Sequence, residues 1–455
     1  MNCSPTKTNI RIIRSAPLLL YLFKDTTIKF NDQIEFFIVF NKIKISKKKT
    51  NPKGGINFVI NQMEKMKIPQ ILDKHLGRRV AQAKYSYSQV LMGWSYLNLC
   101  GAKRLEHAHK IKKELAGTPK IRLASPDRIA DIMKRFATQK TTIKQPSSAV
   151  HEFCINTPLV ELMLDVALAL GMVDGDTLDY DNTIIETEKY DSKWTYKKCK
   201  GYQPGVCMIN KTIVGVEARN GNSLASFKMR ETLERSLSLL ESKSIQIKNF
   251  RSDSASYQYE VVGLMEEKDI DFFIRANRSK GLDAMSDTLD NWQEIYIKGK
   301  SWEVEEIEYI PFEQKSVSKK SYRLIIRREA CSKKKYKYYY IMTSNREMST
   351  KEAITFYNNR GASENNFNEL KNGFNWQRLP FSNMNENLVF LILSAMSKNI
   401  YAYLIKYFSD KLDWLKSTIT FMTFLKKFIE VNAYWDSEGV LNLEETEYGF
   451  EKIFS

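Results

Sequence analysis

The stretch that decides the fold is "TLDYDNTII", residues 177–185. Its polarity alternates, which predicts a β-strand with Asp179, Asp181 and Thr183 on one side. Together with the strand-like and helix-like stretches that follow it up to about residue 278, it predicts the order β-β-β-α-β-α-β. That order predicts a mixed α/β sheet with connecting helices. The carboxylates on the first strand are the first candidates for chemistry.

The charge of the chain indicates its partner. Its 455 residues include 70 Lys and Arg against 53 Asp and Glu, a net charge of +17 with a pI near 9.3. Such an excess favours a polyanion, with nucleic acid first. No apolar run reaches the ~18 residues that a membrane span needs, so we expect no membrane partner.

Cysteine and histidine are poorly placed for metal or nucleophile chemistry. None of the six cysteines forms a C-x2-C pair, which argues against a zinc ribbon and a disulfide framework and fits a reducing cytosol. The chain has only four histidines. Carboxylates are therefore the remaining acid–base and metal-binding groups.

The patterning changes several times along the chain and predicts six regions. They are an irregular N-terminal extension (1–50), a helical DNA-binding domain (51–150), the first part of an α/β core (151–278), a β-rich insertion (279–345), the second part of the core (346–410) and a C-terminal helical tail (411–455).

The helical region is expected to carry exposed basic residues, Arg128 among them. Ser125 suits a helix N-cap and Pro126 the first helical position. Two interpretations stay open: a DNA-binding module, which the charge favours, or a structural cap on a larger domain.

Three acidic residues lie where the α/β pattern would bring them together. Asp181 is on the first strand, Asp253 ends the fourth, and Glu364 is on the helix after the insertion. The gap of 72 residues between the aspartates suits two more strands and a helix. The gap of 111 residues to Glu364 needs the β insertion to explain it.

The helix around Glu364 reads "YNNRGASENNFNELK", residues 357–371. Tyr357, Arg360, Glu364 and Lys371 share one face if this helix is continuous, and Gly361 is a point where it could bend. Alone, Arg360 and Glu364 would be read as a surface salt bridge. With Asp181 and Asp253 in place, a metal site is favoured.

Taken together, these motifs resemble the bacterial insertion-sequence transposases with a DDE triad, in particular those described as transposase DDE domain group 1. The matching motifs, in order, are "LDYDNT", "GYQP", "RNGNS", "RSDSA" and Tyr357-x2-Arg360-x3-Glu364-x6-Lys371. The likeness runs from about residue 56 to about residue 403. It implies an RNase H-like sheet flanked by helices and interrupted by the β-rich insertion.

The resemblance also implies a chemistry. Asp181, Asp253 and Glu364 would be the catalytic residues and would hold two Mg²⁺ ions, for which Mn²⁺ can substitute. Tyr357, Arg360 and Lys371 would line the path of the DNA backbone. The enzyme would bind the terminal inverted repeats of its element, cut, and transfer strands by cut-and-paste transposition.

The implied assembly is a homodimer that holds two DNA ends in a synaptic complex, with target DNA as the further partner. The expected location is the bacterial cytoplasm, at the nucleoid. Three alternatives stay open: a catalytically inactive DNA-binding derivative, a Mg²⁺-dependent nuclease, and a glycosidase using Asp179 and Asp181, which the charge disfavours.

Several residues keep two interpretations. Asp179 is a spare ligand or supporting group, or else structural, and Thr183 is expected to support the site by hydrogen bonding. Lys197 and Lys198 lie in a basic loop that contacts phosphate or is only solvated. The tryptophans Trp194, Trp292, Trp302 and Trp376 are more often sheet core than base-stacking residues.

Overall fold

The computed structural model describes residues 50–453 except 116–117, 119–120, 146–148, 313–319, 333–334 and 445, together with four short strands between residues 13 and 36. Contacts divide the chain into the units Met1–Lys49 and Thr50–Ser455. In the first unit, β1 (Ile13–Ser15) pairs with β2 (Leu18–Leu20), and β3 (Ile28–Phe30) with β4 (Ile34–Phe36). The rest of the extension predicted over residues 1–50 lies almost wholly outside the described residues.

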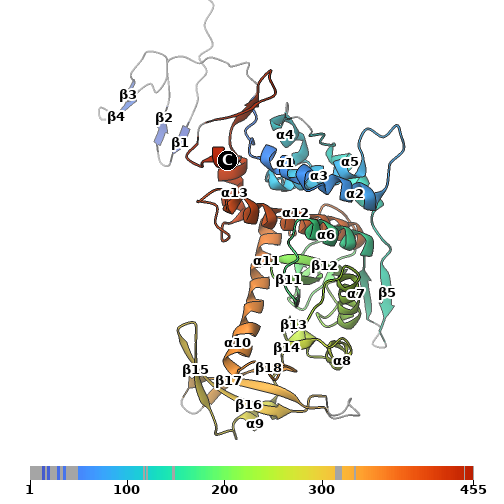
Figure 1. Ribbon diagram of the computed structural model, residues 1–455, viewed down its shortest axis with the longest axis vertical. Coiled ribbons are helices and arrows are strands. Elements are labelled where there is room, and N and C mark those ends of the chain that lie inside the picture. Colours follow the sequence, from blue (N-terminus) through green and yellow to red (C-terminus); the bar gives the residue numbers. More distant parts are fainter. Residues whose placement is uncertain are drawn as a thin grey trace, which may run out of the picture. The chain divides into compact units, whose positions relative to one another are not determined.

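The second unit is built on an 11-stranded sheet (Figure 1). Its central strands are ordered β12-β11-β7-β13-β14. Strands β7, β13 and β14 are parallel, and β11 is antiparallel to both of its neighbours. This is the RNase H-like order of a mixed α/β sheet, as predicted. The bounds are β7 (Thr177–Asn182), β11 (Gly205–Ile209), β12 (Thr212–Arg219), β13 (Asn249–Ser252) and β14 (Asp271–Arg275).

Both edges of the core sheet are extended. The β-rich insertion continues it beyond β14 in the order β18-β17-β16-β15, and β6 and β5 follow β12 on the other side. The insertion is therefore part of the same sheet, as its aromatic and β-branched composition allows. The bounds are β5 (Thr141–Lys144), β6 (Val150–Cys154), β15 (Gln293–Ile297), β16 (Lys300–Tyr309), β17 (Tyr322–Ser332) and β18 (Lys335–Thr343).

One face of the sheet is apolar along its length. Leu178, Phe250 and Phe272 of the core strands lie in one cluster with Leu324 and Met342 of the insertion. Residues of α6 (Thr157–Ala169), α7 (Met229–Ser242), α8 (Tyr259–Glu267) and α9 (Lys280–Ser286) contribute to this cluster.

The opposite face carries two separate apolar clusters. Over β11 and β12, Val206 and Ile213 pack in a cluster that includes the long helix α12 (Met384–Ser409). Over β14 and the insertion, Phe273 and Ile325 pack with Ile354 of α10 (Thr350–Asn358). Between the two clusters, β7 and β13 carry polar residues on this face, among them Asp179 and Arg251. The apolar cover of the sheet is interrupted there, and the candidate site lies at this place.

The N-terminal helices share the core of α12, so they form one body with the sheet. Ser125 caps α5 by accepting a hydrogen bond from Arg128 N, as predicted, and Pro126 is the first residue of that helix. The bounds are α1 (Ile56–Lys65), α2 (Ile68–Leu76), α3 (Tyr87–Leu99), α4 (His107–Glu114), α5 (Pro126–Arg135) and α6 (Thr157–Ala169).

The region after α12 differs from the predicted helical tail. It contains the short helix α13 (Phe421–Phe424) and a π-helical turn over Leu425–Ile429. A hairpin of β19 (Ala433–Trp435) and β20 (Leu441–Leu443) and a 3-10 turn over Phe450–Ile453 follow. Residue 433 also bridges to Asn51, so the hairpin is anchored to the start of the unit. A long-range pairing of this kind leaves no local pattern in the sequence.

Helix α12 is long and apolar enough to cross a membrane by length and composition. However, 94% of its most apolar window is buried inside the protein. Its apolar residues are accounted for by the core that it shares with the sheet and the N-terminal helices.

Candidate active site

Asp181 and Asp253 lie side by side at the ends of two parallel strands. The register of β7 and β13 pairs Tyr180 with Ser252, and each aspartate is the next residue along its chain. Adjacent strands are about 4.8 Å apart, so the two carboxylates start from neighbouring backbone positions. Asp253 also caps the 3-10 turn Ser254–Ser256 by accepting a hydrogen bond from Ala255 N at 2.9 Å.

A buried ion pair lies on the same two strands, two residues before each of these aspartates. Both carboxylate oxygens of Asp179 accept hydrogen bonds from the Arg251 guanidinium, at 2.8 Å each. Arg251 also donates to the carbonyl oxygen of Phe356 on α10, at 2.8 Å. The pair therefore ties β7, β13 and α10 together. Asp179 is thus held by Arg251, and its role beside the site stays a prediction.

Arg360 lies at the centre of the site. Its Nη1 donates to Asp181 Oδ2 at 3.1 Å, and both side chains are mostly buried. Burial acts to lower the pKa of Arg360, but Tyr357, Asp181 and Asp253 outweigh burial and raise it. Both aspartates thus act on the same guanidinium. Tyr357 is beside it, and burial raises the pKa of the tyrosine hydroxyl.

The helix carrying Glu364 is not continuous. Between α10 and α11 (Ala362–Asn372), residues Asn359–Gly361 form a 3-10 turn. This turn changes the angular spacing, so Tyr357, Arg360, Glu364 and Lys371 do not share the uninterrupted helical face that was predicted. Gly361 is where we expected a bend.

Glu364 is exposed in the first turn of α11. Within the described residues, no three His, Cys, Asp or Glu side chains lie close enough together to hold a metal ion. The structure thus gathers Asp181, Asp253, Arg360 and Tyr357, and leaves the third carboxylate outside that group.

The two aspartates have the chemistry that a hard divalent cation prefers. Carboxylate oxygens are the usual protein ligands of Mg²⁺. Two carboxylates at neighbouring strand ends repel one another unless a cation lies between them, and here the Arg360 guanidinium supplies positive charge. The residues present therefore fit a cation at this place.

The remaining predicted residues lie outside that group. Lys197 and Lys198 are exposed on the loop between β9 (Lys193–Trp194) and β10 (Lys200–Tyr202). Lys371 is half-buried, and its pKa is lowered by burial first and then by the positive charge of Lys197. Arg128 is exposed on α5, in an ion pair with Asp131 at 3.0 Å.

Thr183 follows β7 and is buried, and its backbone N–H donates to Pro204 O at 3.2 Å. Of the tryptophans, Trp376 is fully buried, as predicted. Trp302 and Trp292 are partly covered, with the guanidiniums of Arg327 and Arg328 at 3.9 Å and 4.1 Å from their ring centres. Trp194 is 62% exposed, so its interpretation as core is wrong.

Sequence reasoning missed Arg251, although the chain carries a signal for it. Arg251 stands two residues before Asp253, and Asp179 stands two residues before Asp181. Any pairing of the two strands that aligns the later residues also aligns the earlier ones. Opposite charges at aligned positions on one face predict an ion pair.

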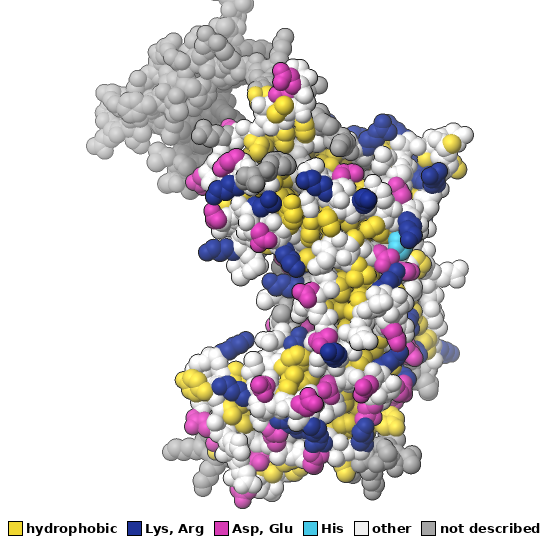
Figure 2. Space-filling model, viewed as in Figure 1, with side chains coloured by type: hydrophobic (Ala, Val, Ile, Leu, Met, Phe, Trp, Pro, Cys, Tyr) yellow, Lys and Arg dark blue, Asp and Glu magenta, His cyan; other side chains and the backbone are white. Residues whose placement is uncertain are grey.

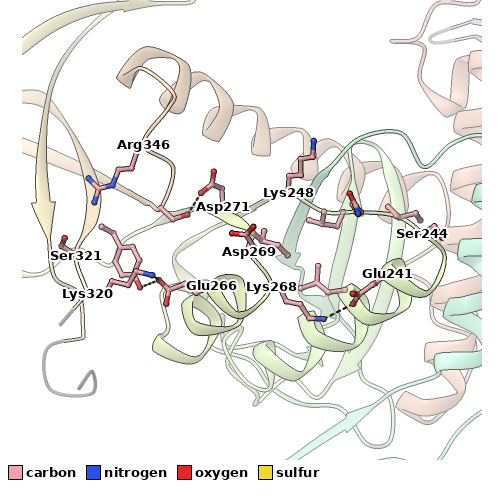
Figure 3. Close-up of a pocket in the computed structure, with 17 residues that line it drawn as sticks. Glu241, Ser244, Lys248, Glu266, Lys268, Asp269, Asp271, Lys320, Ser321 and Arg346 are labelled. Carbon is pink, nitrogen blue, oxygen red and sulfur yellow. Dashed lines mark hydrogen bonds and ion pairs between the residues drawn. The ribbon is translucent and has the colours of Figure 1, made fainter. Parts of the chain in front are cut away.

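A large cavity of about 1130 Å³ lies at the other end of β13 and β14 (Figure 3). Its charged lining is balanced: Lys268 pairs with Glu241 at 3.0 Å, and Asp271 accepts from Ser344 Oγ at 2.7 Å. Glu241 and Asp271 thus have partners within this cavity. They are not aligned on neighbouring strands as Asp181 and Asp253 are at the opposite strand ends.

Comparison with known proteins gives a family. A family model described as "Transposase DDE domain group 1" matches residues 45–433. A comparison with curated protein sequences finds no match. A solved structure, described as the cryo-EM structure of a piggyBac transposase synaptic complex with hairpin DNA, is similar at 10% identity and a TM-score of 0.40. The alignment covers 83% of this chain and 78% of that one.

Proposed function

Since the chain belongs to the transposase DDE domain group 1 family, we propose that it cuts the DNA ends of its own element and joins them to target DNA, with Asp181, Asp253 and Glu364 as the catalytic carboxylates. The observation that carries this proposal is the alignment of Asp181 and Asp253 at neighbouring parallel strand ends, beside Arg360.

DDE transposases generally use divalent metals, and Asp181 and Asp253 would hold the ion here. When bound there, Mg²⁺ would supply activation of the attacking oxygen, and a second ion would supply stabilisation of the leaving oxygen of the phosphodiester. Mn²⁺ would substitute. Glu364 would complete the ligand set through a movement of α11 about the 3-10 turn at residues 359–361.

The chain's own groups would bind and orient the DNA backbone. Arg360 offers a planar guanidinium that can leave Asp181 and bind a phosphate oxygen once a metal ion neutralises the aspartates. The Tyr357 hydroxyl is beside it and can donate a further hydrogen bond. Lys371 and Lys197 add a second positive position along the same path.

The expected substrate is double-stranded DNA, at the terminal repeats of the element and at the target. The unit Thr50–Ser455 is hollowed on one side, between the region around α13 and the insertion, with Lys and Arg side chains near both edges (Figures 1 and 2). We further propose that two copies act together on two ends, at the bacterial nucleoid, and that excision and insertion follow a cut-and-paste route.

The test uses a labelled DNA end from the native locus with Mg²⁺. We expect Asp181→Asn, Asp253→Asn and Glu364→Gln each to bind this DNA within about twofold of the wild type and to lose cleavage by at least about a hundredfold. The matched control is Asp269→Asn, because Asp269 is an exposed acid at the opposite end of the sheet. Control protein should cleave normally.

The outcomes separate the alternatives. Cleavage with joining supports a transposase, cleavage alone a nuclease, and binding without cleavage an inactive derivative. Normal cleavage by any one variant would remove that residue from the catalytic set. A glycosidase is disfavoured because Asp179 is bound on both oxygens by Arg251 and cannot serve as the second acid–base group.

A further inference from the structure

A loop beside the site exposes large aromatic side chains. Tyr190, Trp194 and Tyr196 are 90%, 62% and 70% exposed, within seven residues of chain. We call residues 189–200, which contain them, the aromatic loop. Tryptophan and tyrosine are rarely left so open in one place unless they bind a partner, because each exposes a large apolar area.

The loop is also strongly basic. Lysines stand at positions 189, 193, 197, 198 and 200, and the single acid, Asp191, is buried. Lys200 Nζ lies 5.9 Å from the ring centre of Trp194, and Lys197 Nζ lies 6.0 Å from that of Tyr196. The surface therefore combines flat aromatic faces with closely placed positive charge.

The base of the loop is firmly held. Asp191 accepts hydrogen bonds from Met384 N at 3.0 Å and Lys140 Nζ at 2.8 Å, and it also binds the Tyr202 hydroxyl. A side chain at Gly221 would come within 2.3 Å of the carbonyl oxygen of Lys193, so backbone packs closely beneath the loop. The aromatic side chains are therefore presented on an anchored support, which lowers the entropy cost of binding.

The position of the loop relates it to the site. It follows β7, which carries Asp181, and Tyr190 N donates to Ser382 O at 3.1 Å, just before α12. At its other end the loop leads through β10 to β11, whose Gly205 pairs with Asn182, the residue after Asp181. The charge of Lys197 also acts on Lys371 of α11, the helix of Glu364. A DNA strand held at the aspartates would thus have the aromatic loop beside it.

From these observations we propose that the aromatic loop binds unpaired bases next to the DNA end that is cut, with Trp194 and Tyr196 stacking on base faces and Lys197 holding an adjacent phosphate. This rests on the proposed function. Paired bases keep their faces covered by their neighbours, whereas unpaired bases offer them to aromatic side chains. Such stacking contributes about 1–3 kcal/mol per base and tolerates any sequence.

The experiment measures binding without divalent ions, so that no cleavage occurs. The two probes are a labelled duplex and the same duplex with four unpaired nucleotides at one end. We expect the wild type to bind the tailed probe about tenfold more tightly, and Trp194→Ala and Tyr196→Ala each to lose most of that preference, from the usual strength of one stacked base. Trp194→Phe should retain part of it.

Two controls define the result. Tyr259→Ala removes an exposed tyrosine from α8 and should leave the preference unchanged. Lys197→Ala should weaken both probes equally and reduce the slope of log affinity against log salt by about one. Because Trp194 and Tyr196 are exposed, their variants should unfold at the wild-type temperature, which separates a lost contact from a lost fold.

The proposal is overturned if the wild type binds both probes equally, or if Trp194→Ala keeps the full preference. Preferential binding of the loop to anionic lipid vesicles over the tailed probe would also overturn it and assign the loop to a membrane. Failure of the proposed function is distinguishable: Asp181→Asn should keep the preference for the tailed probe while losing cleavage.

Discussion

Asp179 and Asp181 are two residues apart on one strand and have different roles because their surroundings differ. Asp179 is buried and both of its oxygens are bound by Arg251, so removing its charge leaves a buried guanidinium without its partner. Asp181 is at the strand end, where Arg360 is shared among Asp181, Asp253 and Tyr357. Asp181 accepts from Asn182 N on one oxygen and from Arg360 on the other. We propose that the first carboxylate anchors the strands and that the second binds the ligand when Arg360 moves to the DNA.

We therefore expect Asp179→Asn to lower the free energy of unfolding by about 3–5 kcal/mol, the usual cost of breaking a buried pair. Asp181→Asn should lower it by less than about 2 kcal/mol, because Arg360 keeps two other partners. Urea unfolding of both variants measures the contrast. Equal losses in the two variants would contradict the assignment of Asp179 as the anchor.

Lys398 on α12 is a second residue whose role follows from burial. It is fully buried beneath α11, and its Nζ donates to Asn366 Oδ1 at 2.9 Å and also to the carbonyl oxygen of Lys211. Asn366 is two residues after Glu364. Burial lowers the pKa of Lys398 to about 8, against the raising effect of Glu369.

A lowered lysine pKa makes stability depend on pH with a definite sign. Above about pH 8 folded Lys398 has released a proton that the unfolded chain keeps until about pH 10.4. The free energy of unfolding from this group should thus rise with pH in that window, by at most about 1.4 kcal/mol per unit.

Urea unfolding of wild type and Lys398→Met at several pH values between about 8 and 10 isolates this effect. We expect the wild type to gain stability relative to the variant as the pH rises. Burial raises the pKa of Cys100 and Cys207 to about 12, which acts with the opposite sign, but it does so in both proteins and cancels in the difference. A constant difference would mean that Lys398 is not buried.

At the scale of elements, the break between α10 and α11 decides how Glu364 is presented. Figure 1 shows the two helices running from the insertion to α12. Gly361 in the intervening turn has φ −55°, and an added Cβ would meet nothing within 4 Å. Alanine therefore fits without strain and favours a continuous helix.

We expect Gly361→Ala to raise the free energy of unfolding by about 0.4–1 kcal/mol, since it reduces the freedom of the unfolded chain. If Glu364 reaches the aspartates by movement about this turn, the same variant should cleave DNA more slowly. Thermal unfolding and a single-turnover cleavage assay measure the two effects. Faster cleavage together with higher stability would show that the turn is not a working hinge.

Elements with a local periodic signal were predictable from the sequence, and so was part of the site. The alternation in residues 177–185 and the helix signals after it define the order of the core strands, and that order aligns Asp181 with Asp253. The hairpin after α13 was not predictable, because its anchor at Asn51 is far away in sequence. Trp194 was misjudged because the usual burial of tryptophan does not say whether a particular loop is covered.

At the scale of the whole molecule, the contacts divide the chain between Lys49 and Thr50. The second unit is anchored just after that point. Asn51 N donates to Ala433 O at 2.7 Å, Gly54 N to Val431 O at 2.6 Å, and Lys53 pairs with Glu430 at 3.1 Å. These contacts join the first residues of the unit to its last hairpin, so they connect the two ends of its chain.

Two truncated chains therefore differ in outcome although they differ by only six residues. A chain that begins at Thr50 keeps all of these contacts, and we expect its thermal unfolding midpoint and its DNA cleavage to match the full chain. A chain that begins at Ile56 loses them, and at about 0.5–1.5 kcal/mol for each hydrogen bond it should be less stable by about 2–4 kcal/mol. Calorimetry of the two truncated chains measures this difference.

Equal midpoints would mean that residues 50–55 do not anchor the hairpin. A drop already at Thr50 would mean that residues 1–49 contribute to the stability of the second unit.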